Sequence, residues 1–523
     1  MNFKHDEYDK LEVQHQIDKA MTINGNGRTI DASNFTVAAA WYQDVYGTNE
    51  KYAYSGLYPD ALIPLANYKF RRQDQIEKGR NQALYINFLS TKDMKPGKYK
   101  GTGVLTLDGV KYDIPFEVTI YDAEMPTAVH QKSCYLIWYE EIVKGELQNE
   151  SPDMHQKYYD FALTKRLSPG ALPDQYMNTA EAFAQAVYEK VANNEKVTNI
   201  RFPFTSSNFS KNAIREYLQK LVDKQLECIA LGDTETDMFA KLMFYTDDEP
   251  GKDKYDAVKS HDKDVYDLKK ELAPQLNGYP KLQESLMKIK HLCTVPFSES
   301  LIATEETGGV QCWCPQYQHF NTEANRQKYF ERQKSTDRLC GEEVWWYGCT
   351  DPQSPYSSVH LDADLLTLRA RRYMQFEYGI QGDIYWNFNY YSKYTMSGFT
   401  YARDVWHDPI SWGHCAGDGQ LYYPGVTYGI YGPITTLRLE NLLATNEEYE
   451  YLWMIDQKVQ EYNELKGKSL DTRELLTTYF RRLYKNVIAY LDDFEMNKVR
   501  IELLQVNEML NKDLEAGINF LTK

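Results

Sequence analysis

Hydrophobic and polar residues alternate along much of the first 125 residues of the chain. In the clearest stretch, Ile114, Phe116 and Val118 are separated by single polar or proline residues, and an Asp-Gly dipeptide stands a few positions before them. A period of two puts successive side chains on opposite faces of a strand, and Asp-Gly between two such runs is a strong hairpin signal. The pattern predicts an N-terminal β-sandwich over residues 1–125, with one apolar and one polar face to each sheet.

From residue 126 onward, short apolar runs alternate with longer amphipathic segments. Two of these segments, 256–272 and 361–378, carry apolar residues at helical spacing. Strands that alternate with helices form a parallel sheet, and seven or eight such repeats over roughly 300 residues favour a (β/α)8 TIM-like barrel, here residues 126–465. The active site of such a barrel lies at the C-terminal ends of its strands. The predicted strands are Cys134–Trp138, Ile200–Phe204, Leu242–Thr246, Leu292–Pro296, Val310–Cys314, Val344–Tyr347 and Ile384–Asn387.

The remaining residues, 466–523, are predicted to be helical. Asp471 and Glu474 have the spacing of a capping box, and the apolar residues that follow recur every three or four positions. An apolar stripe of this kind indicates packing and carries no chemistry. The expected fold is therefore multidomain, with a β-sandwich, an α/β barrel and a C-terminal helical segment.

Composition and charge narrow the class of partner. A chain of 523 residues is too long for one ordinary core, and its 26% of charged residues are typical of a soluble globular protein. The net charge of −16 argues against nucleic acid and anionic membranes as partners. No apolar run approaches the roughly 20 residues needed to insert across a membrane. The N-terminus has no apolar signal-peptide segment, so we expect a cytoplasmic protein, or a secreted one whose signal has been removed.

The cysteines and histidines do not have the spacing of a metal site. The eight cysteines include no C-x-x-C pair, the ten histidines include no H-x-x-x-H pair, and eight cysteines in so long a chain make no disulfide framework. The sequence therefore predicts no metal and no cofactor. Tyrosine is unusually frequent, with 43 residues beside 9 tryptophans, and aromatic faces of this kind stack on sugar rings as well as packing in cores.

The candidate chemistry lies where one predicted strand ends. An aromatic, β-favouring run closes in Asp247, Asp248, Glu249 and Pro250. Carboxylates this close raise each other's pKa, so that one stays protonated while its neighbour is ionised. Glycoside hydrolysis needs this combination of a proton donor and an anion. Taken alone, an Asp-Glu-Pro sequence is more often an acidic surface loop than a catalytic site.

Thr246–Pro250, Gly417–Gly425 and Gly432–Glu440 are motifs that follow one another in a fixed order with several others. Taken together, these motifs resemble glycoside hydrolase family 123, which was formerly catalogued as a domain of unknown function. The likeness spans about residues 50–455, and Thr246–Pro250 matches the catalytic Asp-Glu-Pro of the family. One departure stands at 443–446, where Leu-Ala-Thr-Asn replaces the Arg-Asp-Gly of relatives. The other matching motifs are Gly56–Pro64, Lys95–Gly101, Val344–Tyr347, Gly382–Asn387, Gly417–Gly425, Gly432–Glu440 and Glu447–Leu452.

The resemblance implies a retaining exo-β-N-acetylgalactosaminidase that hydrolyses a terminal β-GalNAc of a glycan or glycoconjugate. In that family the 2-acetamido oxygen of the substrate is the nucleophile and forms an oxazolinium intermediate. Carried over by motif, Glu249 is the general acid and base, and Asp248 holds the acetamido N–H. Strand alternation would instead put Asp247 on the same face as Glu249, so Asp247 is the rival for that role.

Aromatic and amide residues at the ends of the late strands are candidate substrate-binding residues: Trp313, Trp345, Tyr347, Trp386 and Asn387. Core packing is an equally good explanation for each aromatic, and of the consecutive Trp345 and Trp346 only one can face the barrel interior. Two alternatives to the galactosaminidase stay open. One is a β-N-acetylglucosaminidase or other hexosaminidase on the same scaffold, and the other is a carbohydrate-binding protein without catalysis.

Overall fold

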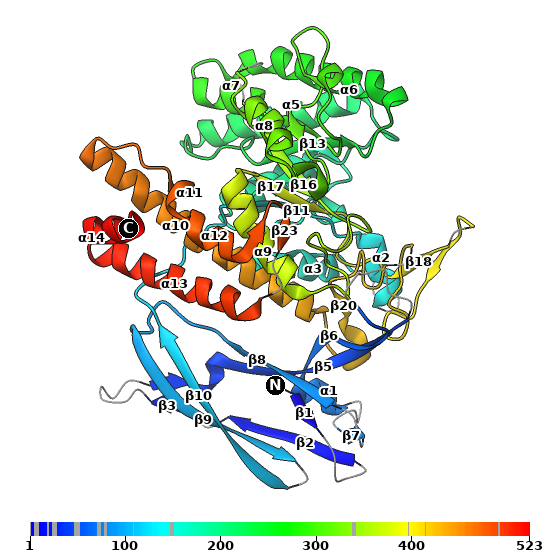
Figure 1. The fold of residues 1–523 in the computed structure, drawn as a ribbon. Helices are drawn as coiled ribbons and strands as arrows, with labels where there is room; N and C mark the ends of the chain where they lie inside the picture. Colours follow the sequence, from blue (N-terminus) through cyan, green and yellow to red (C-terminus); the bar gives the residue numbers. More distant parts are fainter. Residues whose placement is uncertain are drawn as a thin grey trace.

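The computed structural model consists of two N-terminal β-sheets, a parallel barrel and a group of C-terminal helices (Figure 1). It describes residues 2–4, 10–17, 20–22, 29–46, 53–70, 75–77, 81–107, 109–146, 151–336, 341–395, 397–413, 415–489 and 492–523.

The N-terminal sheets are antiparallel, and they have the strand orders β1-β8-β5-β6 and β4-β3-β9-β2-β7, with β10 pairing β9. Val110 of β10 lies opposite Leu107 of β9, which confirms the predicted hairpin. Phe35 and Phe116 meet between the two sheets at 6.1 Å, so apolar faces form the core of a sandwich. The elements are β1 (Asn2–Lys4), β2 (Lys10–Ile17), β3 (Ala20–Thr22), β4 (Thr29–Asp31), β5 (Phe35–Val45), β6 (Gly56–Pro64), α1 (Leu65–Phe70), β7 (Gln75–Glu77), β8 (Asn81–Phe88), β9 (Gly97–Leu107) and β10 (Val110–Ile120).

The second part is a parallel sheet that curls into a barrel, with the order β11-β17-β16-β15-β14-β13-β12. A non-strand segment occupies the eighth position: the Tyr135 amide donates to the Ser168 carbonyl at 3.2 Å, and the Arg201 amide donates to the Gly170 carbonyl at 2.9 Å. This segment joins the two edge strands, so the TIM-like architecture predicted from the sequence is confirmed. The strands are β11 (Lys132–Tyr135), β12 (Ile200–Arg201), β13 (Leu242–Asp247), β14 (Lys290–Cys293), β15 (Cys312–Trp313), β16 (Glu343–Tyr347) and β17 (Gly382–Tyr385).

Helices surround the barrel and continue into the C-terminal segment, which lies beside it in Figure 1. Asp471 caps a short helix by accepting from the Arg473 amide at 2.7 Å, as its sequence context predicted. No helix within the described ranges is long and apolar enough to cross a bilayer. The helices are α2 (Tyr139–Gly145), α3 (Pro152–Thr164), α4 (Ala180–Ala186), α5 (Lys211–Ala230), α6 (Tyr255–Leu272), α7 (Pro280–Met287), α8 (Glu323–Gln333), α9 (Leu365–Tyr378), α10 (Leu437–Lys466), α11 (Thr472–Leu475), α12 (Thr477–Leu483), α13 (Asp493–Lys512) and α14 (Leu514–Leu521).

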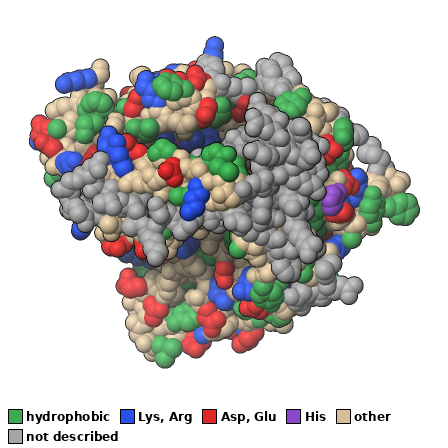
Figure 2. All heavy atoms as spheres, turned by 90° about the horizontal axis from the view of Figure 1, so that it is seen from below, with side chains coloured by type: hydrophobic (Ala, Val, Ile, Leu, Met, Phe, Trp, Pro, Cys, Tyr) green, Lys and Arg blue, Asp and Glu red, His purple; other side chains and the backbone are tan. Residues whose placement is uncertain are grey.

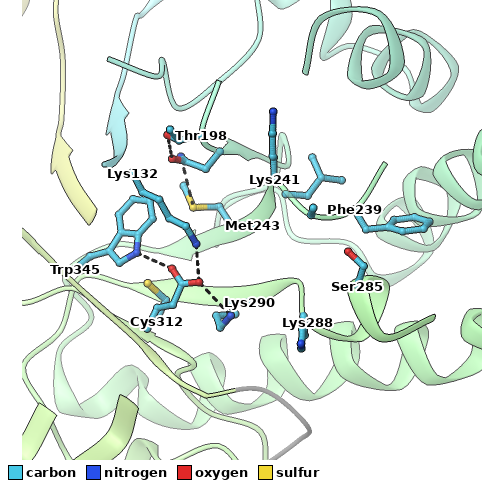
Figure 3. Close-up of a pocket in the computed structure, with 14 residues that line it drawn as sticks. Lys132, Thr198, Phe239, Lys241, Met243, Ser285, Lys288, Lys290, Cys312 and Trp345 are labelled. Carbon is cyan, nitrogen blue, oxygen red and sulfur yellow. Dashed lines mark hydrogen bonds and ion pairs between the residues drawn. The ribbon is translucent and has the colours of Figure 1, made fainter. Parts of the chain in front are cut away.

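The amino-terminal end of the barrel holds a cavity of ≈ 270 Å³ lined by the first residues of several strands (Figure 3). Lys132 and Lys290 both contact Glu343 there, at 2.8 and 3.1 Å, and Trp345 donates its indole N–H to the same carboxylate at 2.9 Å. Burial by itself would raise the pKa of Glu343, but the two ammonium groups outweigh it and lower the pKa to about 2. This end of the barrel is therefore held together by charge pairing, as expected of the face opposite an active site.

A buried ion pair joins the sandwich to the barrel. Arg438, at the start of α10, donates from Nε and Nη2 to the two carboxylate oxygens of Asp60 on β6, at 2.9 and 2.8 Å. Its remaining hydrogen bonds go to the carbonyls of Val359, Gly417 and Gln420, at 2.8, 2.8 and 2.6 Å. Both charged side chains are almost completely buried, so each depends on the other for compensation.

We predict that Asp60→Asn destabilises the protein by about 3–5 kcal/mol, the usual cost of leaving one member of a buried pair uncompensated. Urea unfolding followed by fluorescence measures it. The matched control is Glu117→Ala, which removes the exposed pair with Lys100 in the same sandwich and should leave the unfolding midpoint unchanged. Equal midpoints for the two variants would contradict the role given to Asp60.

Candidate active site

The candidate acids stand at the C-terminal end of the barrel, directly after β13. All residues of β13 are buried, whereas Asp248 and Glu249 are exposed. The pairing of β13 with β14 shifts register between Phe244 and Asp247, so the regular alternation of the strand ends before the acids. Glu249 also has a φ of 43°, a left-handed conformation that is uncommon for a residue other than glycine. The backbone thus turns both side chains out of the strand.

Thr294, which follows β14, fixes this turn. The Glu249 amide donates to the Thr294 hydroxyl at 2.7 Å, and that hydroxyl donates to Oδ1 of Asp248, also at 2.7 Å. The Tyr245 hydroxyl donates to the same Oδ1 at 2.7 Å. One carboxylate oxygen of Asp248 is therefore saturated by two hydroxyl groups, and Oδ2 is the oxygen left to accept a further donor.

Tyr347 lies across the barrel mouth at the end of β16 and donates its hydroxyl to Oε1 of Glu249. Burial raises the pKa of Tyr347, and the hydrogen bond to the carboxylate raises it further, so Tyr347 remains a donor. This contact brings a residue selected from the sequence as a substrate contact directly against the candidate acid. It also leaves Oε2 of Glu249 as the oxygen able to carry an acidic proton.

Asp247 lies in a different environment from its two neighbours. It is buried and accepts from the Thr246 hydroxyl at 2.7 Å, from Nδ1 of His261 on α6 at 3.0 Å, and lies 3.2 Å from Nε2 of His291 on β14. Burial alone would raise the pKa of Asp247, but the hydrogen bonds from His261, His291 and Thr246 lower it well below its ordinary value. Asp247 is thus a buried, ionised group that ties β13 to α6 and β14, apart from the exposed pair.

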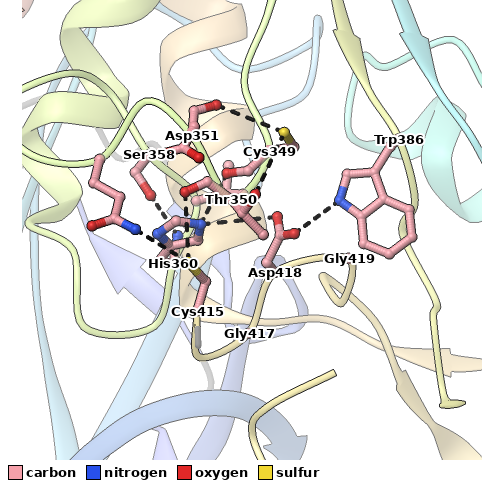
Figure 4. Close-up of polar contacts among 12 residues, drawn as sticks. Cys349, Thr350, Asp351, Ser358, His360, Trp386, Cys415, Gly417, Asp418 and Gly419 are labelled. Carbon is pink, nitrogen blue, oxygen red and sulfur yellow. Dashed lines mark hydrogen bonds and ion pairs between the residues drawn. The ribbon is translucent and has the colours of Figure 1, made fainter. Parts of the chain in front are cut away.

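The loop after β17 carries Trp386, which is half-buried and donates its indole N–H to Oδ2 of Asp418 at 3.0 Å (Figure 4). Asp418 is fully buried, and its Oδ1 accepts from the Tyr385 hydroxyl at 3.0 Å. Burial raises the pKa of Asp418, while these donors and His360, 3.9 Å away, lower it in part. The carboxylate holds the indole ring in a set orientation.

Cys349 lies in the loop between the surroundings of Glu249 and those of Asp418. It stands two residues after Tyr347, and burial raises the pKa of its thiol to about 11, with the charges of Asp418 and Glu249 both adding to the shift. The Cys349 carbonyl accepts from Nε2 of His360 at 3.0 Å, and the same nitrogen lies 3.9 Å from Oδ1 of Asp418. Glu249 and the support of Trp386 belong to one neighbourhood at the barrel mouth.

Two of the selected substrate contacts lie away from the mouth, and a third is buried behind it. Trp313 has no exposed surface, packs against Phe297 and donates to Glu342 at 2.5 Å on the helix-facing side of the sheet. Trp345 is buried inside the barrel and lines the cavity at its opposite end. Asn387 is fully buried, with its side-chain oxygen accepting from the Asn389 amide at 2.6 Å. Strand alternation explains Trp313, because only every second residue faces the barrel interior. Trp345 does face the interior, but it lies two residues before the C-terminal end of β16 and so below the mouth.

Other residues of the mouth were not selected from the sequence. Trp138, after β11, packs edge-on against Trp386 at 5.7 Å between ring centres, and Tyr390 lies 5.2 Å from Trp386. The position of Trp138 at the end of a predicted strand was a signal that could have found it. Thr294 gave no such signal, because a threonine near a strand end is ordinary.

The described side chains include no group of three or more His, Cys, Asp or Glu residues placed to hold a metal ion. The cysteines that the structure describes are all free thiols. The chemistry available at the mouth is that of two exposed carboxylates, hydroxyl donors and aromatic rings.

Comparison with known proteins supports a specific family. The model of the glycoside hydrolase 123 catalytic domain matches residues 177–455. Among solved structures, a family 123 glycoside hydrolase from Clostridium perfringens, described for glycolipid glycan hydrolysis, covers 100% of this chain and 93% of its own, at 14% identity and a TM-score of 0.61. That likeness is one of fold.

β-Glucuronidases are more distant. The enzyme of Bifidobacterium dentium covers 83% of this chain and 66% of its own, at 10% identity and a TM-score of 0.32. The enzyme of Ruminococcus gnavus covers 84% of this chain and 68% of its own, at 10% identity and a TM-score of 0.28. Among curated proteins, no sequence relative was found.

We predict that Asp247→Asn lowers the melting temperature at neutral pH and that the difference from wild type narrows as the pH falls below about 4. The pKa of Asp247 is lower in the folded state than in the unfolded one, so its stabilisation is present above the unfolded pKa and is lost on acidification. Thermal melts across pH 3–7 measure this, with the exposed Asp253→Asn as control. Parallel curves of melting temperature against pH for wild type and Asp247→Asn would contradict this role of Asp247.

Proposed function

This chain belongs to glycoside hydrolase family 123, and from that premise we propose that it is a retaining exo-β-N-acetylgalactosaminidase acting by substrate-assisted catalysis. The observation that carries the proposal is the exposed pair Asp248 and Glu249, held in a fixed turn by Thr294 at the barrel mouth. The proposed substrate is the terminal β-GalNAc of a glycan. The glycolipid glycans named for the Clostridium perfringens relative are the first substrates to try.

Glu249 acts as general acid and then as general base. Its Oε1 accepts from Tyr347, so the proton to be transferred sits on Oε2. In the first step this proton passes to the glycosidic oxygen as the bond from C1 to that oxygen breaks. In the second step the ionised Glu249 takes a proton from the water that attacks C1, the bond from C1 to the acetamido oxygen breaks, and the acetamido group and the protonated Glu249 are restored.

Asp248 orients the internal nucleophile. Its Oδ1 is occupied by Tyr245 and Thr294, and its Oδ2 accepts the acetamido N–H of the substrate. The acetamido oxygen then forms a bond to C1 while the leaving group departs, and the carboxylate stabilises the positive charge that develops on the amide. Holding the nucleophile within the same molecule supplies the high effective concentration of an intramolecular reaction.

The adjacency of the two acids favours this mechanism over a double displacement. A conventional retaining pair faces the sugar from opposite sides, with about 5–5.5 Å between its carboxyl groups. Two consecutive residues that share one threonine clamp approach the substrate from the same side. A β-N-acetylglucosaminidase on this scaffold differs only in how the C4 hydroxyl is bound, and a panel of aryl glycosides of N-acetylgalactosamine, N-acetylglucosamine and their parent sugars tests the choice.

We predict that Glu249→Gln lowers kcat/KM on natural glycosides by about 10²–10⁴-fold, the usual worth of general acid–base catalysis. The loss should shrink on a dinitrophenyl glycoside, whose leaving group needs no protonation. Steady-state kinetics on the two substrates measure the ratio, and circular dichroism checks that the variant is folded. Equal losses on good and poor leaving groups would refute the role of Glu249 as acid.

We predict that the acetamido group is required. An aryl sugar with a free hydroxyl at C2 should be nearly inert, and a thiazoline analogue of the cyclic intermediate should inhibit strongly, because it resembles the state that the site binds best. Asp248→Asn should slow the acetamido substrate by several tenfold steps, each about 1.4 kcal/mol, and Asp247→Asn by less. Trapping of a covalent glycosyl ester by a 2-fluoro sugar would replace this mechanism with a double displacement.

A further inference from the structure

The aromatic rings at the barrel mouth continue outward beyond Trp386. Trp412 lies 6.2 Å from Trp386 and 6.3 Å from Tyr390 between ring centres, tilted steeply to both, and stacks on Tyr394 at 4.0 Å with an interplanar angle of 12°. Trp386 and Tyr390 are half-buried and buried, whereas 38% of Trp412 is exposed. The row of rings therefore leads from the interior of the mouth to the surface.

Tyr394 and Trp412 are held at the rim of the barrel mouth by contacts of their own segments. Tyr394 ends strand β18 (Ser392–Tyr394), which pairs with β19 (Thr400–Ala402) in a projecting hairpin (Figure 1). The Tyr394 amide donates to the Ser411 carbonyl at 2.8 Å, which ties the hairpin to the segment that carries Trp412. That hairpin forms the right-hand projection in Figure 1, and hydrophobic side chains gather on the right-hand projection seen from below in Figure 2.

The Trp412 segment also rests on the loop that follows Tyr347. The Cys415 thiol lies 3.5 Å from the Thr350 carbonyl, and a Cβ added at Gly413 would meet the Thr350 methyl group at 3.8 Å. Thr350 stands three residues after Tyr347, which contacts Glu249. Trp412 thus has a defined position relative to the general acid, on the outer side of Trp386.

We infer that Trp412, backed by Tyr394, forms a subsite for the sugar on the leaving-group side of the scissile bond. The inference rests on the proposed exo-glycosidase function. An exo-acting enzyme holds the terminal sugar in the inner part of the mouth, so the rest of the glycan can extend only outward. Trp412 is an exposed ring neighbour of Trp386, and its flat indole suits the C–H face of a pyranose.

Two further features fit a saccharide. Tyr394 stacks on Trp412 and Tyr390 lies at its edge, so little side-chain entropy is lost when a ligand binds. Lys393, which precedes Tyr394 on β18, forms a partly exposed ion pair with Asp408 at 2.7 Å, so the same hairpin also carries a charged hydrogen-bonding group. By contrast, Phe399 is 72% exposed near the end of the same hairpin and makes no ring contact with another described aromatic.

The experiment compares two substrates that share the terminal sugar. One is a β-GalNAc-terminated trisaccharide, and the other is the β-glycosyl azide, whose small leaving group cannot reach Trp412. We expect Trp412→Ala to lower kcat/KM on the trisaccharide about tenfold, equivalent to about 1.4 kcal/mol, and on the azide less than about twofold. Trp412→Phe should recover part of the loss, and the control Phe399→Ala should change neither substrate.

The outcomes separate the subsite from the activity. Equal losses of Trp412→Ala on both substrates would overturn the subsite and assign Trp412 to the terminal-sugar site or to folding. No loss on the trisaccharide would overturn it as well. If Trp412→Ala does not fold, Tyr394→Ala and Trp412→Phe decide by the same ratio. If the folded wild-type protein is inactive on both substrates, the proposed function is contradicted, and so is the subsite inference that rests on it.

Discussion

The buried guanidinium of Arg438 is the interaction on which the architecture of the mouth depends. Desolvating such a cation is costly, and the protein offsets the cost only by meeting it with the Asp60 carboxylate and backbone carbonyls. Two of those carbonyls, on Gly417 and Gln420, flank Asp418. Gly417 has a φ of 78°, and a side chain there would press within 2.8 Å of the guanidinium. The ion pair between domains therefore also sets the backbone of the loop that supports Trp386.

The mouth has a second, separate support in Thr294. One hydroxyl accepts from the Glu249 amide and donates to Asp248, so the left-handed turn and the orientation of the first acid are fixed together. Each of the two carboxylates has one oxygen engaged by protein hydroxyls. In the proposed mechanism the other oxygen of each meets the substrate, and this division lets the two exposed neighbours perform different tasks.

The sequence pattern predicted most of the fold. Alternation of apolar and polar residues in the hairpin, and of strands and helices in the barrel, follows directly from which residues are buried. It failed where tertiary contacts override the pattern. Ser168–Gly170 fills a strand position without strand hydrogen-bonding regularity, and the predicted Val310–Cys314 strand is reduced to Cys312–Trp313. The acidic pair and Tyr347 were visible as motif residues at strand ends. The direction of Trp313 and the separation of Asp247 from Asp248 were not, since they depend on register and on a bulge.

The contact between Asp60 and Arg438 also bears on whether the sandwich and the barrel are separable domains. The family's catalytic-domain match begins at residue 177, yet the first barrel strand begins at Lys132, and a residue of the sandwich pairs with the arginine that holds the loop supporting Trp386. Trp41 and Gln43 of β5 likewise donate to the carbonyls of Trp406 and Val405, at 2.9 and 2.7 Å. The unit that must fold together is therefore larger than the unit that the family model delimits, because the catalytic-domain match omits the sandwich residues that these contacts require.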